Sequence, residues 1–402
     1  MILSDIAEYV TEKVNSDKIT LNQYVTTDSL LQNKRGRQTA QNLPPMPCVL
    51  TSYSQGDILI SNIRPYLKKI WFADSNGGCS TDVLVFRAKK GHSSNFLFAL
   101  LMQDAFFSYM MQGSKGSKMP RGDKNQIMHY KVPTFSSFEE ENIGNIIVNI
   151  ERKIALNRQI NDNLEAMAKQ LYDYWFVQFD FPDENGKPYK SNGGKMVWNE
   201  CMKKSIPADW KTSLLSEWID YSLERVSTSV VSDGDFYTPI EVIPRNKMSL
   251  STTLPVENAV SGLCRYKKKD ILLSNRRVYF HKICLAPFDG LTRDTVMVLR
   301  TKHEVNLGYI YETMFSDSFI SYATKVSYGS LQPVLSWTEA QKYHVLTPAK
   351  NLSEKYGKLI NGLIEKVLSS QMEIIQLTKQ RDELLPLLMN GQATVNYHLS
   401  DD

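Results

Sequence analysis

The sequence contains little cysteine and histidine. Its five cysteines are widely spread and no two form a Cys-x-x-Cys pair, so we expect buried reduced thiols rather than a disulfide framework or a zinc site. The six histidines are scattered without the spacing of metal ligands. The sequence therefore predicts no metal site and no cofactor.

Long apolar runs are also absent. No stretch approaches the roughly 20 apolar residues that a membrane-spanning helix needs, and the first residues turn acidic at Asp5, unlike the basic start of a signal peptide. We expect a soluble, cytoplasmic protein with no membrane segment.

Motifs for catalysis are equally scarce. The sequence contains no Asn-Pro-Pro-Tyr/Phe methyltransferase motif, no glycine-rich cofactor loop and no Walker A lysine. Pro182-Asp183 followed by Asp209-Trp210-Lys211 is a loose nuclease-like pattern, but such patterns often arise by chance. No catalytic residue is predicted.

The chain repeats itself at a constant offset. The segment 56–62 (GDILISN) returns as 269–275 (KDILLSN), and Arg64-Pro65-Tyr66 returns at the same offset as Arg277-Val278-Tyr279. A third match, 82–87 with 294–300, needs one insertion. Such duplication predicts two copies of one mixed α/β domain.

Each copy is followed by a long helical segment with heptad spacing. Apolar residues recur in alternating steps of four and three, which is typical of a coiled-coil seam. Polar residues break both seams, and Arg381 also occupies a seam position. The two helices most simply bury their seams against each other, although each could instead pack on its own domain. The seam residues are Ile143, Ile147, Ile150, Ile154, Asn157, Asn161, Leu164, Leu171, Trp175, Ile360, Leu363, Val367, Ser370, Ile374, Leu377, Leu384 and Leu388.

Charge follows the same division. Basic residues outnumber acidic ones in 1–137 and 210–350, and the reverse holds in 138–209 and 351–402, although the net charge is only +4. Basic blocks attract polyanions. The expected organisation is a first domain at 1–138, a central long helix at 139–180, a linker at 181–209, a second domain at 210–350, a C-terminal long helix at 351–392 and a tail at 393–402.

Two stretches of the central region resemble a known family. The runs 157–165 (NRQINDNLE) and 171–182 (LYDYWFVQFDFP) are similar to the central helix of type I restriction-modification specificity subunits, and so is 185–190 (NGKPYK). The repeated DILI/LS strand resembles the mark of their target-recognition domains. One departure is that the first domain lacks the Ile-Pro-x-x-Trp lead-in found at Ile206 to Trp210.

The resemblance implies a non-catalytic DNA-recognition subunit with an internal pseudo-twofold repeat. Each target-recognition domain would read one half of a split, asymmetric site in double-stranded DNA. Two long antiparallel helices, forming a coiled coil, would separate the domains and dock two methyltransferase subunits, and motor-nuclease subunits would join for cleavage. The seam from Ile143 to Trp175 is about 48 Å long at ~1.5 Å per residue, or about 14 bp of B-DNA at ~3.4 Å per step.

Basic loops at matching places in both domains are the DNA-contact candidates. Glycine lets backbone N–H groups approach phosphates, and arginine, asparagine and glutamine pair with base edges. A solvated surface is the competing interpretation. The candidates are Lys34, Arg35, Arg37, Asn62, Arg64, Lys68, Lys115, Ser117, Lys118, Arg121, Lys124, Arg245, Lys247, Asn275, Arg276, Arg277, Lys282, Arg293, Lys325, Ser330 and Gln332.

Two other functions remain open. A stand-alone DNA-binding or antiphage adaptor protein could have the same fold. A coiled-coil scaffold without a DNA role is the third possibility, although charge alternation and duplication argue against it.

Overall fold

The structure is a computed structural model that describes residues 1–116, 118–228, 231–232, 235–259 and 262–393. The chain divides into two compact units. Unit 1 contains residues 1–155 and the described part of 377–402, and unit 2 contains residues 156–376. Each unit therefore joins one domain to parts of both long helices.

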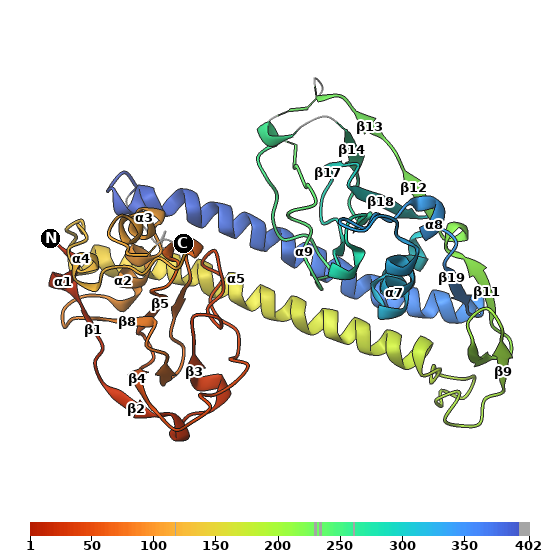
Figure 1. The fold of residues 1–402 in the computed structure, drawn as a ribbon, viewed down its shortest axis with the longest axis horizontal. Coiled ribbons are helices and arrows are strands. Elements are labelled where there is room, and N and C mark those ends of the chain that lie inside the picture. Colours follow the sequence, from red (N-terminus) through yellow and green to blue (C-terminus); the bar gives the residue numbers. More distant parts are fainter. Residues whose placement is uncertain (117, 229–230, 233–234, 260–261, 394–402) are drawn as a thin grey trace, which may run out of the picture. The chain divides into compact units, whose positions relative to one another are not determined.

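Unit 1 carries a four-stranded sheet with the strand order β1-β8-β5-β6 and a second sheet with the order β2-β4-β7-β3 (Figure 1). Two short helices, α2 and α3, follow β8. Its elements are α1 Leu3–Ile6, β1 Ala7–Tyr9, β2 Lys13–Asn15, β3 Tyr24–Val25, β4 Val49–Tyr53, β5 Ile58–Ser61, β6 Ile70–Phe72, β7 Gly77–Cys79, β8 Val83–Ala88, α2 Ser94–Leu101, α3 Asp104–Gln112 and α4 Lys124–Ile127.

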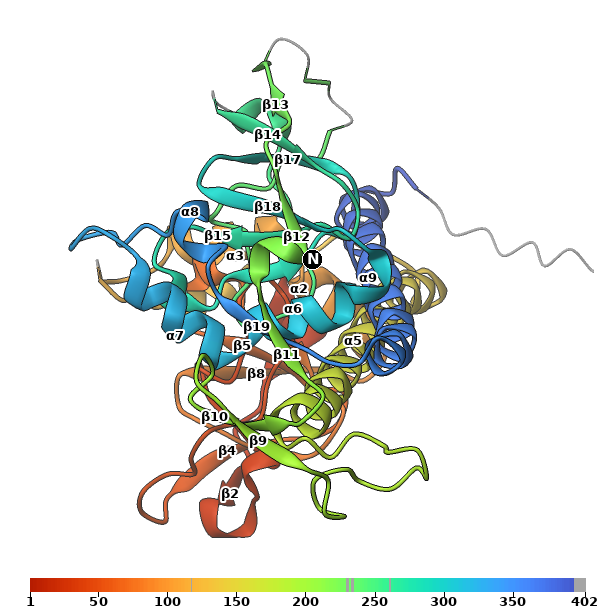
Figure 2. The ribbon, with the colours of Figure 1, turned by 90° about the vertical axis from the view of Figure 1, so that its right-hand side faces the viewer.

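Unit 2 repeats this order. Its main sheet runs β12-β18-β15-β16 and its second sheet β13-β14-β17, while α6 and α7 follow β18 (Figure 2). Its elements are β9 Met196–Asn199, β10 Lys204–Pro207, β11 Lys211–Leu214, β12 Ile219–Ser222, β13 Arg225–Val226, β14 Leu263–Tyr266, β15 Ile271–Ser274, β16 Ile283–Leu285, β17 Gly290–Arg293, β18 Val296–Thr301, α6 Leu307–Phe315, α7 Asp317–Val326, α8 Trp337–Ala340 and β19 His344–Thr347.

The constant offset of the sequence repeat holds from element to element. Strands β5, β6 and β8 begin the same number of residues before β15, β16 and β18, respectively. Helix α2 begins the same number of residues before α6. The match of 82–87 with 294–300 needs no insertion within the strands, because Val83 and Val296 begin equivalent strands. Two helices follow the last strand of the main sheet in each unit, α2 and α3 in unit 1 and α6 and α7 in unit 2.

The main sheet of each unit is buried on both faces. Alternate residues of a strand point to opposite faces, so Ile58 and Ile60 pack with the α2 and α3 side chains while Leu59 joins a separate cluster with Tyr53. In unit 2, Ile271 and Leu273 pack with α6 and α7, and Leu272 packs on the other face. This explains the unbroken apolar strands in both copies.

The long helices α5, Ser137–Tyr172, and α9, Lys350–Met389, also begin at positions related by the repeat offset. A π-helical turn at Asp173–Val177 ends the first. In unit 1 Glu151 of α5 contacts Arg381 of α9, and in unit 2 Asn157 contacts Glu373. The later of these two α5 residues contacts the earlier of the two α9 residues, so the helices are antiparallel. The mixed α/β fold with two domains and a long antiparallel helix pair is confirmed.

The two copies differ at their N-terminal edges. In unit 2, β11 pairs with β19 over four residues. In unit 1 the corresponding place holds a single bridge between Ile2 and Lys131. The first domain therefore has a single bridge at the place where the second has a four-residue strand pair.

Candidate nucleic-acid interface

A repeated tight turn follows the strands β5 and β15. Arg64 and Arg277 both adopt the left-handed conformation, with φ of 52° and 49°. Non-glycine residues rarely adopt it, and it costs roughly 1–3 kcal/mol at each position unless the surroundings enforce it. The same unfavourable backbone conformation occurs in both copies. This indicates that the residues presented by the turn have a function.

A loop packs against each turn. In unit 1 the Arg64 N–H donates to the Pro120 carbonyl at 2.8 Å, and in unit 2 the Arg277 N–H donates to the Pro333 carbonyl at 2.9 Å. We call these loops, residues 115–116 with 118–121 and residues 328–334, the fingers. The ends of each finger bridge each other, Lys115 with Arg121 and Tyr328 with Val334. Equivalent backbone hydrogen bonds thus fix both fingers beside an arginine.

An asparagine lies at the base of each finger. Asn62 is 7% exposed, and its side-chain oxygen has no hydrogen-bond partner among the described residues. The Asn275 oxygen is likewise without a partner there, while its amide nitrogen donates to the Asp294 carbonyl at 2.9 Å. Buried acceptors are normally satisfied. Each asparagine therefore has a buried acceptor oxygen with no protein partner among the described residues.

The first finger encloses a hollow with a basic rim. Asn62, Lys115, Arg121 and Lys124 line it. Arg121 lies 3.1 Å from Asp82 and Lys115 lies 3.4 Å from Asp123, so both cations keep a partly exposed acidic neighbour.

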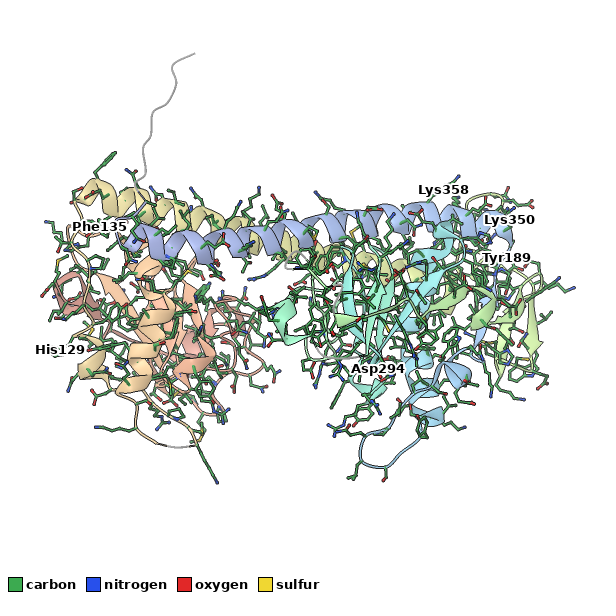
Figure 3. All side chains as sticks on the ribbon, turned by 90° about the horizontal axis from the view of Figure 1, so that it is seen from above. His129, Phe135, Tyr189, Asp294, Lys350 and Lys358 are labelled. Carbon is green, nitrogen blue, oxygen red and sulfur yellow. The ribbon has the colours of Figure 1, made fainter. Side chains whose placement is uncertain are left out.

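The finger face lies away from the long helix in each unit. In Figure 3, His129, next to the hollow-lining segment at 124–125, is remote from Phe135 beside α5. Asp294, next to Asn275, is remote from Lys358 on α9.

Eleven predicted contact residues are exposed or half-exposed in these turns, in the fingers or, for Lys124 and Lys325, in the helices α4 and α7. The unit 2 members carry fewer charges than those of unit 1. The set contains Arg64, Lys115, Lys118, Arg121, Lys124, Arg276, Arg277, Lys325, Ser330, Gln332 and, half-buried, Asn275. Asn62 is buried beneath the first finger, and Ser117 lies outside the described residues.

Several predicted DNA contacts instead have protein partners. Lys34 is 8% exposed and lies 2.7 Å from Asp104, which also binds Lys68 at 2.8 Å. Lys247 binds Asp162 at 2.5 Å. Each of these lysines therefore has an acidic partner that is remote in the sequence, and its contact with DNA stays a prediction.

Three of the other basic candidates contact protein groups. Arg37 lies 4.3 Å from the Trp71 ring, and Arg245 lies 4.0 Å from the Phe280 ring. Lys282 donates to the Ile240 carbonyl at 2.6 Å, and burial lowers its pKa. Arg293 has a buried Nε without a partner among the described residues, and Arg35 is exposed.

Tyr66 and Tyr279 were missed among the candidates. They occupy equivalent places in the two turns and are 50% and 46% exposed. The repeat itself contains the signal, since Arg-Pro-Tyr and Arg-Val-Tyr align, but the candidates taken from it were basic and polar residues and no aromatic ones. Aromatic rings beside arginine can stack on bases or pack on sugars.

Every predicted seam position of α5 and α9 is buried or half-buried. Asn157 donates to Glu373 at 2.7 Å. The side-chain oxygen of Asn161 is buried and has no partner among the described residues. The polar seam positions are therefore inside the helix pair rather than on its outer face.

No helix in the described part of the chain has the length and apolar character to cross a membrane. Among the same residues, no group of three histidine, cysteine or acidic side chains is placed to hold a metal ion.

Comparisons with known proteins give one family. Residues 10–166 match the family described as type I restriction modification DNA specificity domain. The chain is 23% identical to the type I restriction enzyme MjaIX specificity subunit of Methanocaldococcus jannaschii, over 90% of this chain and 83% of the relative. It is 23% identical to the HindI specificity subunit of Haemophilus influenzae, over 97% and 98%. The crystal structure of a type I restriction-modification S subunit from M. genitalium has the same fold, with a TM-score of 0.56, 14% identity and coverage of 97% and 95%.

Proposed function

The chain belongs to the family of type I restriction-modification DNA specificity subunits, and from this premise we propose that each domain reads one half of a split, asymmetric DNA target. The observation that carries the proposal is the repeated turn and finger. In both units a left-handed arginine, an asparagine with an unpartnered oxygen and a finger come together. Phosphate contacts position a protein on DNA and base contacts give specificity.

The differences between the fingers support two different half-sites. The first finger carries Lys118 and Met119 where the second carries Leu331 and Gln332. Lysine reaches phosphates or guanine, while glutamine pairs with adenine. The first domain accordingly gains more of its affinity from charge.

We further propose that the chain is non-catalytic and contributes recognition to a complex. Two methyltransferase subunits would dock on the pair of long helices, and motor-nuclease subunits would join for cleavage. The alternative, a stand-alone adaptor with the same fold, predicts no dependence of DNA methylation on this chain.

Co-expression with a type I methyltransferase subunit tests the function. Sequencing of methylated adenines should reveal one split motif with two short halves that appears only when this chain is present. A methylation motif independent of the chain, or none, would contradict the proposal. In the same assay Arg277→Ala should reduce methylation through one half-site, because loss of a base-reading arginine costs about 1–3 kcal/mol. Lys203→Ala, an exposed lysine paired with Glu200, is the matched control and should leave the motif unchanged.

The length of the helix pair is proposed to set the gap between the half-sites. Deleting one heptad from each helix, residues 158–164 and 371–377, keeps both seams in register and removes about 10 Å at ~1.5 Å per residue. The gap of the methylated motif should shorten by about 3 bp. An unchanged gap in a folded, methylation-competent variant rules out the ruler. Deletion from one helix only, which breaks the register, should abolish methylation.

A further inference from the structure

Unit 2 contains a cavity of about 550 Å³ between the C-terminal turns of α5 and the helices α6 and α7. Five carboxyl groups line it: Asp162, Glu165, Asp173, Glu312 and Asp317. Met248, Tyr311 and Phe315 supply an apolar side. The finger residues discussed above are absent from this lining, so the cavity is separate from the candidate DNA interface.

The acidic groups of the cavity are only partly neutralised. Asp173 binds Lys169 at 2.6 Å, and Lys247 binds Asp162 at 2.5 Å and lies 3.9 Å from Glu165. Glu312 is 3% exposed, and among the described residues its carboxylate has neither a hydrogen bond nor an ion pair. A buried charge without a partner is strongly unfavourable.

The pKa values of the two innermost carboxyl groups reflect this environment. Burial raises the pKa of Glu312 to about 8; Lys169 opposes the shift, while Asp173 and Glu165 add to it. Burial likewise raises the pKa of Glu165 to about 7, against the charge of Lys247. Both groups would be stabilised by a cation placed between them.

A second observation also indicates a missing ligand. Tyr311 lines the cavity and is 1% exposed, yet its hydroxyl has no partner among the described residues. A buried hydroxyl is normally hydrogen-bonded, since leaving it unpaired costs about 1–3 kcal/mol. The hydroxyl can accept a hydrogen bond from an ammonium group.

The repeat provides an internal comparison. The counterparts of Glu165, Tyr311 and Glu312 in unit 1 are Thr378, Phe98 and Ala99, so the ionisable groups are present only in unit 2. The counterpart of His281 is Lys68, which binds Asp104 at 2.8 Å. His281 lies 3.6 Å from Asp317, the counterpart of Asp104. Unit 1 thus supplies its own ammonium group where unit 2 has a histidine and two additional carboxyl groups, the buried Glu312 and the half-buried Glu165.

We propose that the unit 2 cavity binds a small protonated alkylamine. One ammonium group is received by Glu165 and Glu312 and by the Tyr311 hydroxyl, while the alkyl chain lies against Met248 and Phe315. A second ammonium group, in a diamine, would reach Asp317 at the exposed rim.

Titration calorimetry on the full chain tests the site, with putrescine as the probe and n-butylamine as its single-charge counterpart. Putrescine should bind with a dissociation constant below about 1 mM and more tightly than butylamine. Glu312→Gln should weaken putrescine binding at least tenfold, and Tyr311→Phe by a smaller factor. Asp220→Asn, an exposed carboxylate of the same unit, should leave the affinity unchanged.

A second variant tests the inference from the repeat. His281→Lys restores the lysine of unit 1 at a position with nearly the same backbone, φ 51° against 49°. The new ammonium group should occupy the acidic site, weaken putrescine binding at least tenfold and leave the melting temperature unchanged or higher. Unaltered binding in both His281→Lys and Glu312→Gln would overturn the proposal. So would an equal heat of binding from magnesium chloride at matched ionic strength, or no putrescine binding below about 10 mM.

The pH dependence separates this site from a structural acidic cluster. The charged or titratable groups that face Glu312 come from four elements, and His281 and Asp317 line the same cavity. They are Glu165, Lys169 and Tyr172 from α5, Asp173 from the π-helical turn, Tyr311 from α6 and Tyr356 from α9. Raising the pH from 6 to 8.5 ionises Glu312 and Glu165, because the pKa values of these carboxyl groups are about 8 and about 7, while putrescine stays protonated. Affinity should rise over this range with release of protons, and Glu312→Gln should flatten the profile. A profile that is flat in the unmodified chain would contradict the site.

Discussion

Replacing Arg300 by methionine is expected to destabilise unit 2 by about 3 kcal/mol. Arg300 forms a bidentate ion pair with Asp270, with distances of 2.7 and 2.6 Å, and the Asp270 side chain is 2% exposed. The variant leaves a buried carboxylate with the Lys267 N–H as its remaining donor. Uncompensated buried charge is among the few causes of such large losses from one substitution.

Urea unfolding followed by circular dichroism measures this effect. The transition assigned to unit 2 should move to lower urea in Arg300→Met, and the double variant Arg300→Met/Asp270→Asn should recover part of the loss, since it no longer buries a charge. Lys302→Met, next to β18 and 3.8 Å from the exposed Asp220, should cost less than about 1 kcal/mol. An equal loss in the two single variants would show that burial of the pair is unimportant.

The same pair occurs in unit 1. Arg87 binds Asp57 at 2.8 Å through both nitrogens, and Asp57 is the counterpart of Asp270. The sequence already contained the pair, because Asp57 and Arg87 recur as Asp270 and Arg300 at one offset. Apolar strands, heptad seams and a constant offset therefore predicted the sheets and the long helices, since periodicity reports directly on burial.

Side-chain partners could not be predicted in this way. Lys34 belongs to a basic cluster in the sequence, but Asp104, far along the chain in α3, neutralises it in the structure. Asn62 was selected as a possible base-reading residue, yet its unpartnered oxygen depends on Gly122 and the finger packing closely over it. Such contacts depend on tertiary geometry, and neither composition nor local spacing records them.

The cavity of unit 2 is the clearest case. Glu165 and Glu312 lie far apart in the sequence, and the residues around each of them predict only a charged side chain on a helix. Only the packing of α5 against α6 makes both of them cavity-lining groups with raised pKa values. The equivalent residues of unit 1, Thr378 and Ala99, carry no carboxyl group. The acidic cavity therefore does not belong to the fold that the two units share.

Arg381→Met should destabilise unit 1 by about 3–5 kcal/mol. Arg381 is 3% exposed at a seam position of α9, and it lies 2.5 Å from Glu151 of α5 and 2.8 Å from Asp382. Burial alone would lower its pKa, but the charges of Glu151 and Asp382 raise it, so the arginine stays charged. Methionine fills a similar volume and leaves Glu151, whose side chain is 16% exposed, without its partner.

The double variant Arg381→Met/Glu151→Leu tests whether the ion pair stabilises the two helices or instead fixes their register. A well-packed apolar pair is often as stable as a buried ion pair, or more stable by about 1–4 kcal/mol, so the double variant should recover the full loss in urea unfolding. Lys379→Met on the same helix, exposed and 3.8 Å from Glu383, should change stability by less than about 0.5 kcal/mol. Failure of the double variant to recover would mean that the ion pair stabilises the helices directly. Recovery would mean that the arginine is in the seam to fix the register of the two helices, because polar seam residues fix register at a cost in stability. A spacer between two recognition domains functions only in one register.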